Sequence, residues 1–287
     1  MSAPLILSAV GGSFNNRAGT LNIAHEAIML IGAFFAVYGS YLTSNPWIGL
    51  LVAIGVCLIV SVIYGVFVFH IGSNPMVVSI ALNTGAGGFT ALVLYSLFRI
   101  RGSLVDSRIK SFSVIDIPFI KNIPWLGKIV SGQIALVYIA FLFAAIAWIV
   151  MYRTTFGLHI RAVGMNPKAA QTAGISILKY KWIANIICGI ADGAAGAFLP
   201  LCGISMFTED MSSGRGFLAV AAILIGQGNP IKVMLSCLLF GYAEALTVSL
   251  QNINIPSQIV LMLPYVATVF VLLVSGIRNL KTQKDVL

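Results

Sequence analysis

Long apolar stretches separated by short polar segments form the main pattern of this chain. A helix that crosses a bilayer needs about 20 mostly apolar residues, because no water is available there to satisfy the backbone. Two shorter apolar pieces, 3–14 and 217–227, predict half-helices or re-entrant segments. The pattern predicts an all-α, polytopic membrane protein with eight or nine membrane elements. Stretches that meet or approach the full length are 21–42, 47–69, 77–98, 134–151, 183–205, 233–250 and 259–276.

Composition excludes a soluble protein. Apolar residues make up 59% of the 287 residues and charged residues only 9%, whereas soluble domains carry about 25% charged residues. The formal net charge of +9 is distributed between apolar runs, which indicates membrane topology rather than nucleic-acid binding. Residues 1–4 carry no basic group, so no removable signal peptide is expected. We therefore expect one transmembrane domain, 1–287, in the plasma membrane.

The cysteines predict no metal or redox chemistry. All four lie in apolar stretches, and none forms a C-x-x-C pair. We expect them to act as small apolar packing residues. They are Cys57, Cys188, Cys202 and Cys237.

Loop charges predict the sidedness of the chain. Segment 153–181 contains five Lys and Arg residues and no acid, and the tail after residue 277 is also basic. Lys and Arg collect in cytoplasmic loops, so both should lie inside. An even number of crossings between these two segments then places loop 206–216 outside. Counting back across the span 134–151 places loop 99–130 outside as well. Loop 99–130 is itself basic, which suggests either an acidic protein partner or a long loop that translocates regardless of charge.

Capping residues at both ends predict a short helix within segment 153–181. Asn166 can cap it, Pro167 suits the first helical position, and Gly174 can adopt a left-handed stop. Its body, 168–173, is about two turns long and marginal by itself in water. Its small face could approach another protein closely; the alternative is a plain surface connector. That face consists of Ala169, Ala170 and Ala173.

Four segments carry a family resemblance. Residues 17–34 are similar to the pattern R-A-G-x-x-N-I-x-x-E-x-x-M-L-I-G-A-F, and residues 152–175, 208–217 and 255–265 follow in the same order. Together they resemble the permease subunits of ATP-binding-cassette (ABC) importers, in the branched-chain amino acid/ribose-type superfamily. Within the simple-sugar and nucleoside branch, the chain is most similar to nucleoside permeases that work with a basic-membrane-protein lipoprotein receptor.

The resemblance implies a type II importer-like permease that forms half of a pathway for nucleosides or related purine compounds. It implies no enzyme activity and no cofactor, since ATP is bound by a separate ATPase subunit; the chain has no G-x-x-x-x-G-K-[ST] phosphate loop. The other implied partners are a second, homologous permease, an extracellular substrate-binding lipoprotein and the bilayer, with no nucleic acid. The helix after Asn166 would be the coupling helix. The residues expected to couple to the ATPase are Gly164, Asn166, Pro167, Lys168, Ala169, Ala170 and Gly174.

Three acids lie inside apolar stretches, where charges are costly and usually functional or paired. Glu26 stands near a helix start, so capping is the alternative to a ligand role. Asp192 lies between Gly189 and Gly193, whose spacing favours close helix contact and a bond across it. Glu244 either lines a water-filled translocation path or pairs with an Arg or Lys of a neighbouring helix.

A nucleoside is neutral and rich in hydroxyl groups, so its pathway would favour amides and hydroxyls. The alternative is that such groups join helices. The candidate pathway residues are Asn22, Glu26, Asn83, Asn185 and Glu244, with Thr84 and Thr247 as further hydroxyl candidates.

Other functions stay open at this stage. A ribose-like sugar permease would use the same architecture. An ion-coupled secondary transporter would show inverted repeats with paired broken helices, which the positions 3–14 and 217–227 do not match. A membrane scaffold fits the composition but leaves the capped helix unexplained.

Overall fold

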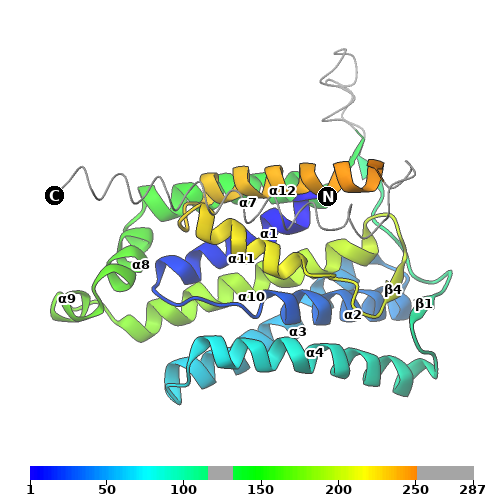
Figure 1. The fold of residues 1–287 in the computed structure, drawn as a ribbon, viewed down its shortest axis with the longest axis horizontal. Helices are drawn as coiled ribbons and strands as arrows, with labels where there is room; N and C mark the ends of the chain where they lie inside the picture. Colours follow the sequence, from blue (N-terminus) through cyan, green and yellow to red (C-terminus); the bar gives the residue numbers. More distant parts are fainter. Residues whose placement is uncertain (116–131, 251–287) are drawn as a thin grey trace, which may run out of the picture.

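The computed structural model describes residues 1–115 and 132–250, and within them the chain is mainly helical (Figure 1). Two small antiparallel pairs of strands, β1 with β4 and β2 with β3, complete it. The helices are α1 (Ser2–Arg17), α2 (His25–Thr43), α3 (Pro46–Gly65), η1 (Val66–His70), α4 (Pro75–Phe98), α7 (Ala135–Arg153), α8 (Thr155–Met165), α9 (Pro167–Thr172), α10 (Ile177–Leu201), α11 (Arg215–Ile225) and α12 (Pro230–Leu250). The strands are β1 (Ser103–Val105), β2 (Val114–Ile115), β3 (Gln133–Ile134) and β4 (Met206–Thr208).

Among the described residues, six helices are long and apolar enough to cross a membrane: α2, α3 with η1, α4, α7, α10 and α12. They correspond to the first six stretches predicted from the sequence. Helix α2 begins at His25 rather than at residue 21, because Asn22 Oδ1 accepts the Ala24 N–H and closes a turn there. The stretch 259–276 lies outside the described residues, so the total of eight or nine elements stays a prediction.

Four helices begin at an Asn-Pro pair. Proline fixes the first helical φ and needs no hydrogen bond there, while the asparagine side chain accepts from a free N–H of the first turn. Asn45 accepts from Trp47 N and Asn74 from Met76 N, each at 2.9 Å. Asn229 accepts from Ile231 N at 3.1 Å, and α9 begins in the same way.

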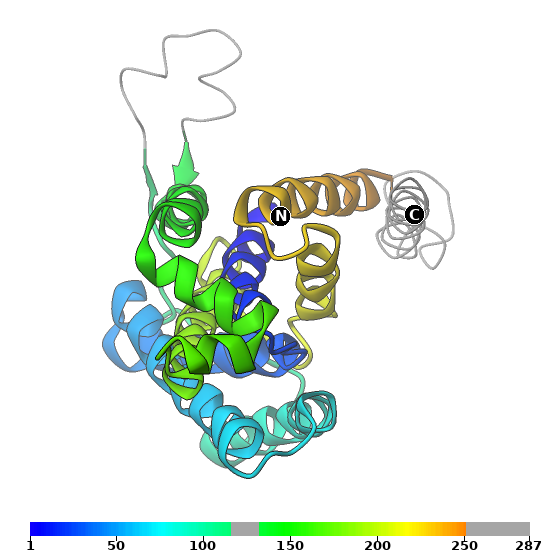
Figure 2. The ribbon, with the colours of Figure 1, turned by 90° about the vertical axis from the view of Figure 1, so that its left-hand side faces the viewer.

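The centre of the bundle consists of α1, α2 and α10, and α10 contacts both of the others through small residues. A Cβ added to Gly196 of α10 would overlap the Met29 carbonyl of α2, and one added to Gly11 of α1 would overlap Ala191 Cβ of α10. Such contacts let helix backbones approach closely in a membrane. Figure 2 looks along the bundle from the α9 end and shows α4 at its perimeter.

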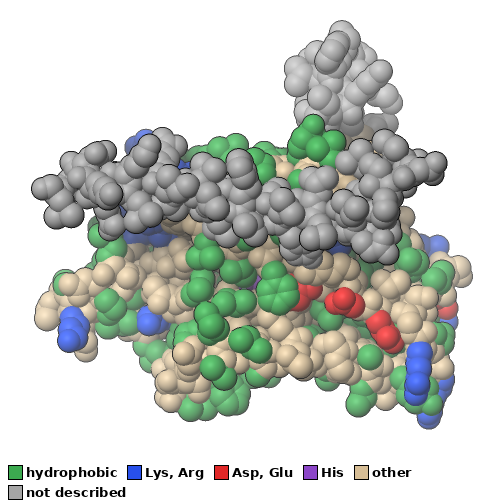
Figure 3. Space-filling model, viewed as in Figure 1, with side chains coloured by type: hydrophobic (Ala, Val, Ile, Leu, Met, Phe, Trp, Pro, Cys, Tyr) green, Lys and Arg blue, Asp and Glu red, His purple; other side chains and the backbone are tan. Residues whose placement is uncertain are grey.

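The two ends of the bundle differ. Helices α8 and α9 form one end, and the pairing of β1 with β4 forms the other (Figure 1). Loop 99–115 and β4 therefore share an end opposite α9, which is compatible with the predicted sidedness; that sidedness stays a prediction. On the face in Figure 3, Lys and Arg side chains lie mainly toward the two ends.

Helix α11 is a half-length element. Its 11 residues span about 16 Å, roughly half of a hydrocarbon core. It follows β4 and leads back toward the α9 end, where residues 226–229 turn into α12 (Figure 1). The predicted short piece 217–227 is thus a half-helix.

Candidate functional site

Helix α9 has the ends that the sequence predicts. Asn166 Oδ1 accepts the Ala169 N–H at 3.1 Å, and Pro167 is the first helical residue. Gly174 has φ +79°, and the Ile175 N–H donates to the Ala170 carbonyl at 3.0 Å. These bonds satisfy backbone groups at both ends of a helix of only six residues.

Helix α8, which precedes α9 directly, was not predicted. Thr154 Oγ1 accepts the Gly157 N–H at 3.2 Å and caps it. Its buried residues are Gly157, Ile160 and Val163, a spacing of three that marks one helical face and could have revealed the helix. The segment is therefore two consecutive helices rather than one helix in a connector.

Two of the predicted coupling residues pack against other parts of this chain. Ala170 is only 4% exposed, and Gly164 packs so tightly on the Arg17 carbonyl that a Cβ would overlap it. Both thus hold the segment in place, and the coupling role of all seven residues stays a prediction. The predicted residues that remain exposed are Asn166, Pro167, Lys168, Ala169 and Gly174.

Glu26 holds the start of α11. Its Oε1 accepts the Gly214 N–H at 2.9 Å, and its Oε2 accepts the Gly216 N–H at 2.7 Å. A carboxylate is favoured at a helix N-terminus, where N–H groups are free and the dipole is positive. The sequence predicted an acid suited to capping but assigned it to its own helix, α2. Its actual partner lies about 190 residues away, which local spacing could not reveal.

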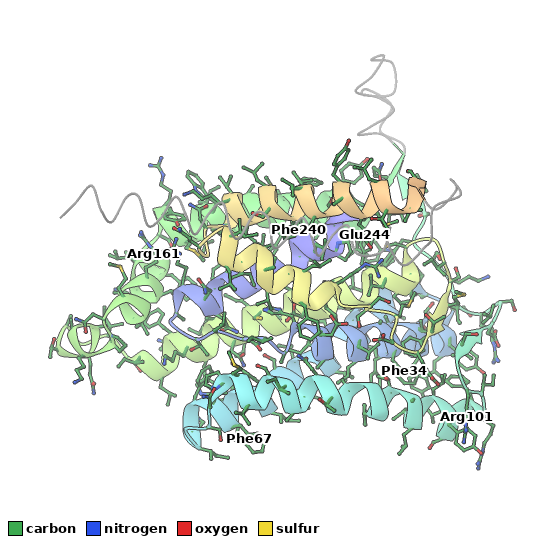
Figure 4. All side chains as sticks on the ribbon, in the orientation of Figure 1. Phe34, Phe67, Arg101, Arg161, Phe240 and Glu244 are labelled. Atoms are coloured by element: carbon green, nitrogen blue, oxygen red, sulfur yellow. The ribbon has the colours of Figure 1, made fainter. Side chains whose placement is uncertain are left out.

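Glu244 pairs with a base, the alternative that the sequence left open. Arg215 Nη2 and Nε donate to Glu244 Oε1 at 2.5 and 3.0 Å. The side chains are 24% and 14% exposed, respectively. This ion pair joins the first residue of α11 to α12, where Figure 4 labels Glu244. Together with Glu26, it holds the N-terminal end of α11.

Asp192 is the centre of a buried polar cluster that joins α1, α2 and α10. His25 Nδ1 lies 2.9 Å from Asp192 Oδ1, and Ser8 Oγ donates to the same oxygen at 2.5 Å. Cys188 Sγ donates to Asp192 Oδ2 at 3.4 Å. The predicted bond of Asp192 across a helix contact is therefore confirmed.

The roles of His25 and Cys188 in this cluster were not predicted. Their ligand atoms and that of Asp192 all lie within 4.8 Å of one another, a separation that a metal ion could bridge. The carboxylate, however, already bonds to the imidazole and to the Ser8 hydroxyl. The cluster thus joins three helices by hydrogen bonds, and Cys188 takes part as a donor in addition to packing.

The amides proposed for the pathway also join helices. Asn185 is fully buried and donates to the Ser61 carbonyl at 2.6 Å. Asn83 bonds to Ile23 O and Ala27 N, each at 3.0 Å, and Asn22 closes the turn before α2. With Glu26 and Glu244, all five predicted pathway residues are occupied by protein partners. Their role in lining a translocation path stays a prediction; these bonds within the chain favour the alternative that such groups join helices.

Comparison with known proteins gives a consistent result. Residues 1–272 match the family described as branched-chain amino acid transport system / permease component. The nucleoside ABC transporter permease protein NupC of Lactococcus lactis is 34% identical, over 94% of this chain and 88% of the relative. The guanosine ABC transporter permease protein NupQ of Bacillus subtilis is 35% identical over the same shares. The glucose ABC transporter permease protein TsgB13 of Haloferax volcanii is 25% identical, over 83% of this chain and 65% of the relative.

No solved structure matches the chain at comparable significance. The family match covers nearly the whole chain, and six helices are apolar and long enough to cross a membrane. These observations identify a multi-pass protein of the cell membrane. The chain belongs to the family of permease components of branched-chain amino acid transport systems.

Proposed function

We propose that this chain is a permease subunit of an ABC importer that carries nucleosides and forms half of the translocation pathway. The observation that carries the proposal is α9, a capped helix exposed at one end of the bundle. A rigid helix transmits displacement, whereas a loose loop would absorb it. The names of the NupC and NupQ relatives support a nucleoside cargo.

The pairing of buried charges supports a neutral cargo. Glu26 neutralises the positive end of α11, Glu244 pairs with Arg215, and Asp192 is hydrogen-bonded to His25 and Ser8. In discontinuous helices of other transporters, a free N-terminus binds an anionic substrate group. Here the protein supplies that anion itself. Among the described residues, this leaves no acid inside the bundle free for a coupling ion.

The partners we propose are an ABC ATPase that contacts α9, a second, homologous permease and an extracellular lipoprotein receptor. ATP would be bound by the ATPase, and this chain would need no cofactor. At the end opposite α9, several basic residues are exposed and suited to an acidic receptor surface. Arg99 and Arg101 lie over the ring of Tyr95, and Arg108 lies over that of Tyr41.

The test is to unwind the start of α9 in the complete transporter. Asn166→Gly with Pro167→Gly should lower receptor-stimulated ATP hydrolysis and guanosine uptake roughly tenfold while the complex still assembles. The matched control is Asn45→Gly with Pro46→Gly, which removes the same kind of helix start at α3 and should leave coupling intact. Equal effects of both pairs would contradict the proposal.

Cargo and driving force are tested on the wild-type protein. Liposomes that contain the full transporter should take up labelled guanosine only with ATP inside. Uptake of glucose but not guanosine would indicate a sugar permease. Gradient-driven uptake by this chain alone would instead indicate a secondary transporter.

A further inference from the structure

The α8–α9 segment rests directly on the end of α1. A Cβ on Gly164 of α8 would overlap the Arg17 carbonyl, and one on Gly19 would lie 3.1 Å from Gly164 Cα. Gly19 also has φ +77°, a conformation that favours glycine. The contact is therefore between two backbones, with no flexible side chain between them. A displacement of α8 would be passed to the end of α1 with little loss.

The side chain of Arg17 extends from this contact to two other elements. Its Nε donates to the Gly228 carbonyl at 3.2 Å, and its Nη2 donates to the Tyr152 hydroxyl at 3.2 Å. Gly228 lies in the turn between α11 and α12, and Tyr152 lies at the end of α7. Among the described residues, the guanidinium bonds to a carbonyl and a hydroxyl rather than to a carboxylate. Its planar fork suits two partners held in fixed directions.

The turn at Gly228 is closely fitted to the end of α1. Gly228 has φ +64°, and a Cβ there would lie 2.6 Å from Asn16 Oδ1 and 3.2 Å from Arg17 Nε. The opposite end of α11 is held by Glu26 and by the Arg215–Glu244 pair. Helix α11 is thus a short helix that is fixed at both ends. Two carboxylates bond to its N-terminal end, and Arg17 bonds to the turn that follows its C-terminal end.

We propose that Arg17 is the positioning residue that carries displacement of the α8–α9 segment to the turn between α11 and α12. This inference rests on the proposed function, in which an ATPase moves α9. The half-helix α11 would then be the intramembrane element that responds to ATP. Arg17 acts through Gly228 and need not touch the cargo.

The test measures the movement of α8 and α11 separately in the complete transporter. Spin labels at Met165, which is 85% exposed, and at Leu224, which is 45% exposed, are each paired with a label at Ile71. Cys202, the one cysteine that is not buried, is first replaced by alanine. In the wild type, a non-hydrolysable ATP analogue should change both distances. In Arg17→Gln, the Met165 distance should still change, the Leu224 distance should not, and uptake per ATP hydrolysed should fall roughly tenfold.

Control variants separate this role from a general loss of structure. Arg153→Gln makes the same chemical change at the end of α7 and should behave as the wild type. Tyr152→Phe removes one of the two bonds of Arg17 and should give a partial loss. If Arg17→Gln fails to assemble, Arg17→Lys serves instead; it should give a smaller Leu224 change, since a lysine cannot reproduce the fork.

The outcomes distinguish the two proposals. A wild-type Leu224 change in Arg17→Gln, or a full-sized change in Arg17→Lys, would overturn this inference alone. A Met165 distance that does not respond to nucleotide in the wild type would overturn the proposed function as well.

Discussion

Helices α2 and α4 are both apolar and long enough to cross a membrane, yet they occupy opposite environments. In α2, 72% of the most apolar 18-residue window is buried within the chain, against 22% in α4. Gly32 of α2 lies against Cys57 and Gly193, whereas a Cβ on Gly85, Gly87 or Gly88 of α4 would meet nothing within 4 Å. Hydropathy therefore identifies a span but not whether protein surrounds it.

The polar side chains of α2 and those on the exposed side of α4 also differ, in where their hydrogen-bond partners lie. Helix α2 contributes His25 and Glu26, both buried and bonded to distant elements, whereas Thr84 of α4 bonds only to the Ile80 carbonyl of its own helix. In hydrocarbon, a polar group must find a partner. On the exposed side of a perimeter helix that partner is local, whereas a polar group that faces the bundle, such as Asn83 of α4, bonds to another element.

The largest expected effect comes from the Asp192 cluster. Asp192→Ala leaves His25, Ser8 and Cys188 without their shared acceptor. At about 1–3 kcal/mol for each buried polar group left unpaired, it should lower the free energy of unfolding more than the other substitutions. Thr84→Ala should change it by less than about 0.5 kcal/mol. Unfolding by SDS titration, followed by circular dichroism, measures both. Equal values would remove the distinction between the buried surroundings of α2, to which Asp192 of α10 belongs, and the perimeter helix α4.

A smaller effect is expected from the glycines. Gly196→Ala forces a methyl group onto the Met29 carbonyl and should cost about 1–3 kcal/mol. Gly88→Ala on α4 meets open space and should be neutral or stabilise the protein by up to about 1 kcal/mol. The same titration measures both variants. A destabilising Gly88→Ala would show that a partner covers this face of α4.

The smallest effect is expected from Glu26→Gln, which keeps one oxygen acceptor but loses the charge at the start of α11. We expect a loss of about 1 kcal/mol, because bonds to charged groups exceed neutral ones by about that amount. Glu209→Gln is the matched control: Glu209 also accepts a backbone N–H, from Gly102 at 2.9 Å, but at an exposed site. The control should change stability by less than about 0.5 kcal/mol. Thermal denaturation in detergent compares the two.

Local signals predicted the helix ends well. Asn166 and Pro167 start α9 as expected, and Gly174 ends it, since capping depends on neighbouring residues only. Helix α8 was not predicted, although its buried residues Gly157, Ile160 and Val163 stand three apart, the spacing of one helical face.

Partners of the intramembrane acids could not be predicted. Glu26 reaches Gly214 and Gly216, and Asp192 reaches Ser8 and His25, all through contacts between distant segments. A single sequence shows that such acids need partners but not which ones. The bonding partners of the amides Asn22, Asn83 and Asn185 could not be predicted for the same reason.

The sequence alone determined six spans, the half-helix and the capped α9, because hydropathy and capping act over a few residues. It also carried the family resemblance, in segments that keep their order along the chain. Only the tertiary structure decided which helices are central, which acid caps α11 and how Arg17 links α8 to Gly228. Those features depend on backbones packed at van der Waals distance, and that proximity is a property of the assembled bundle.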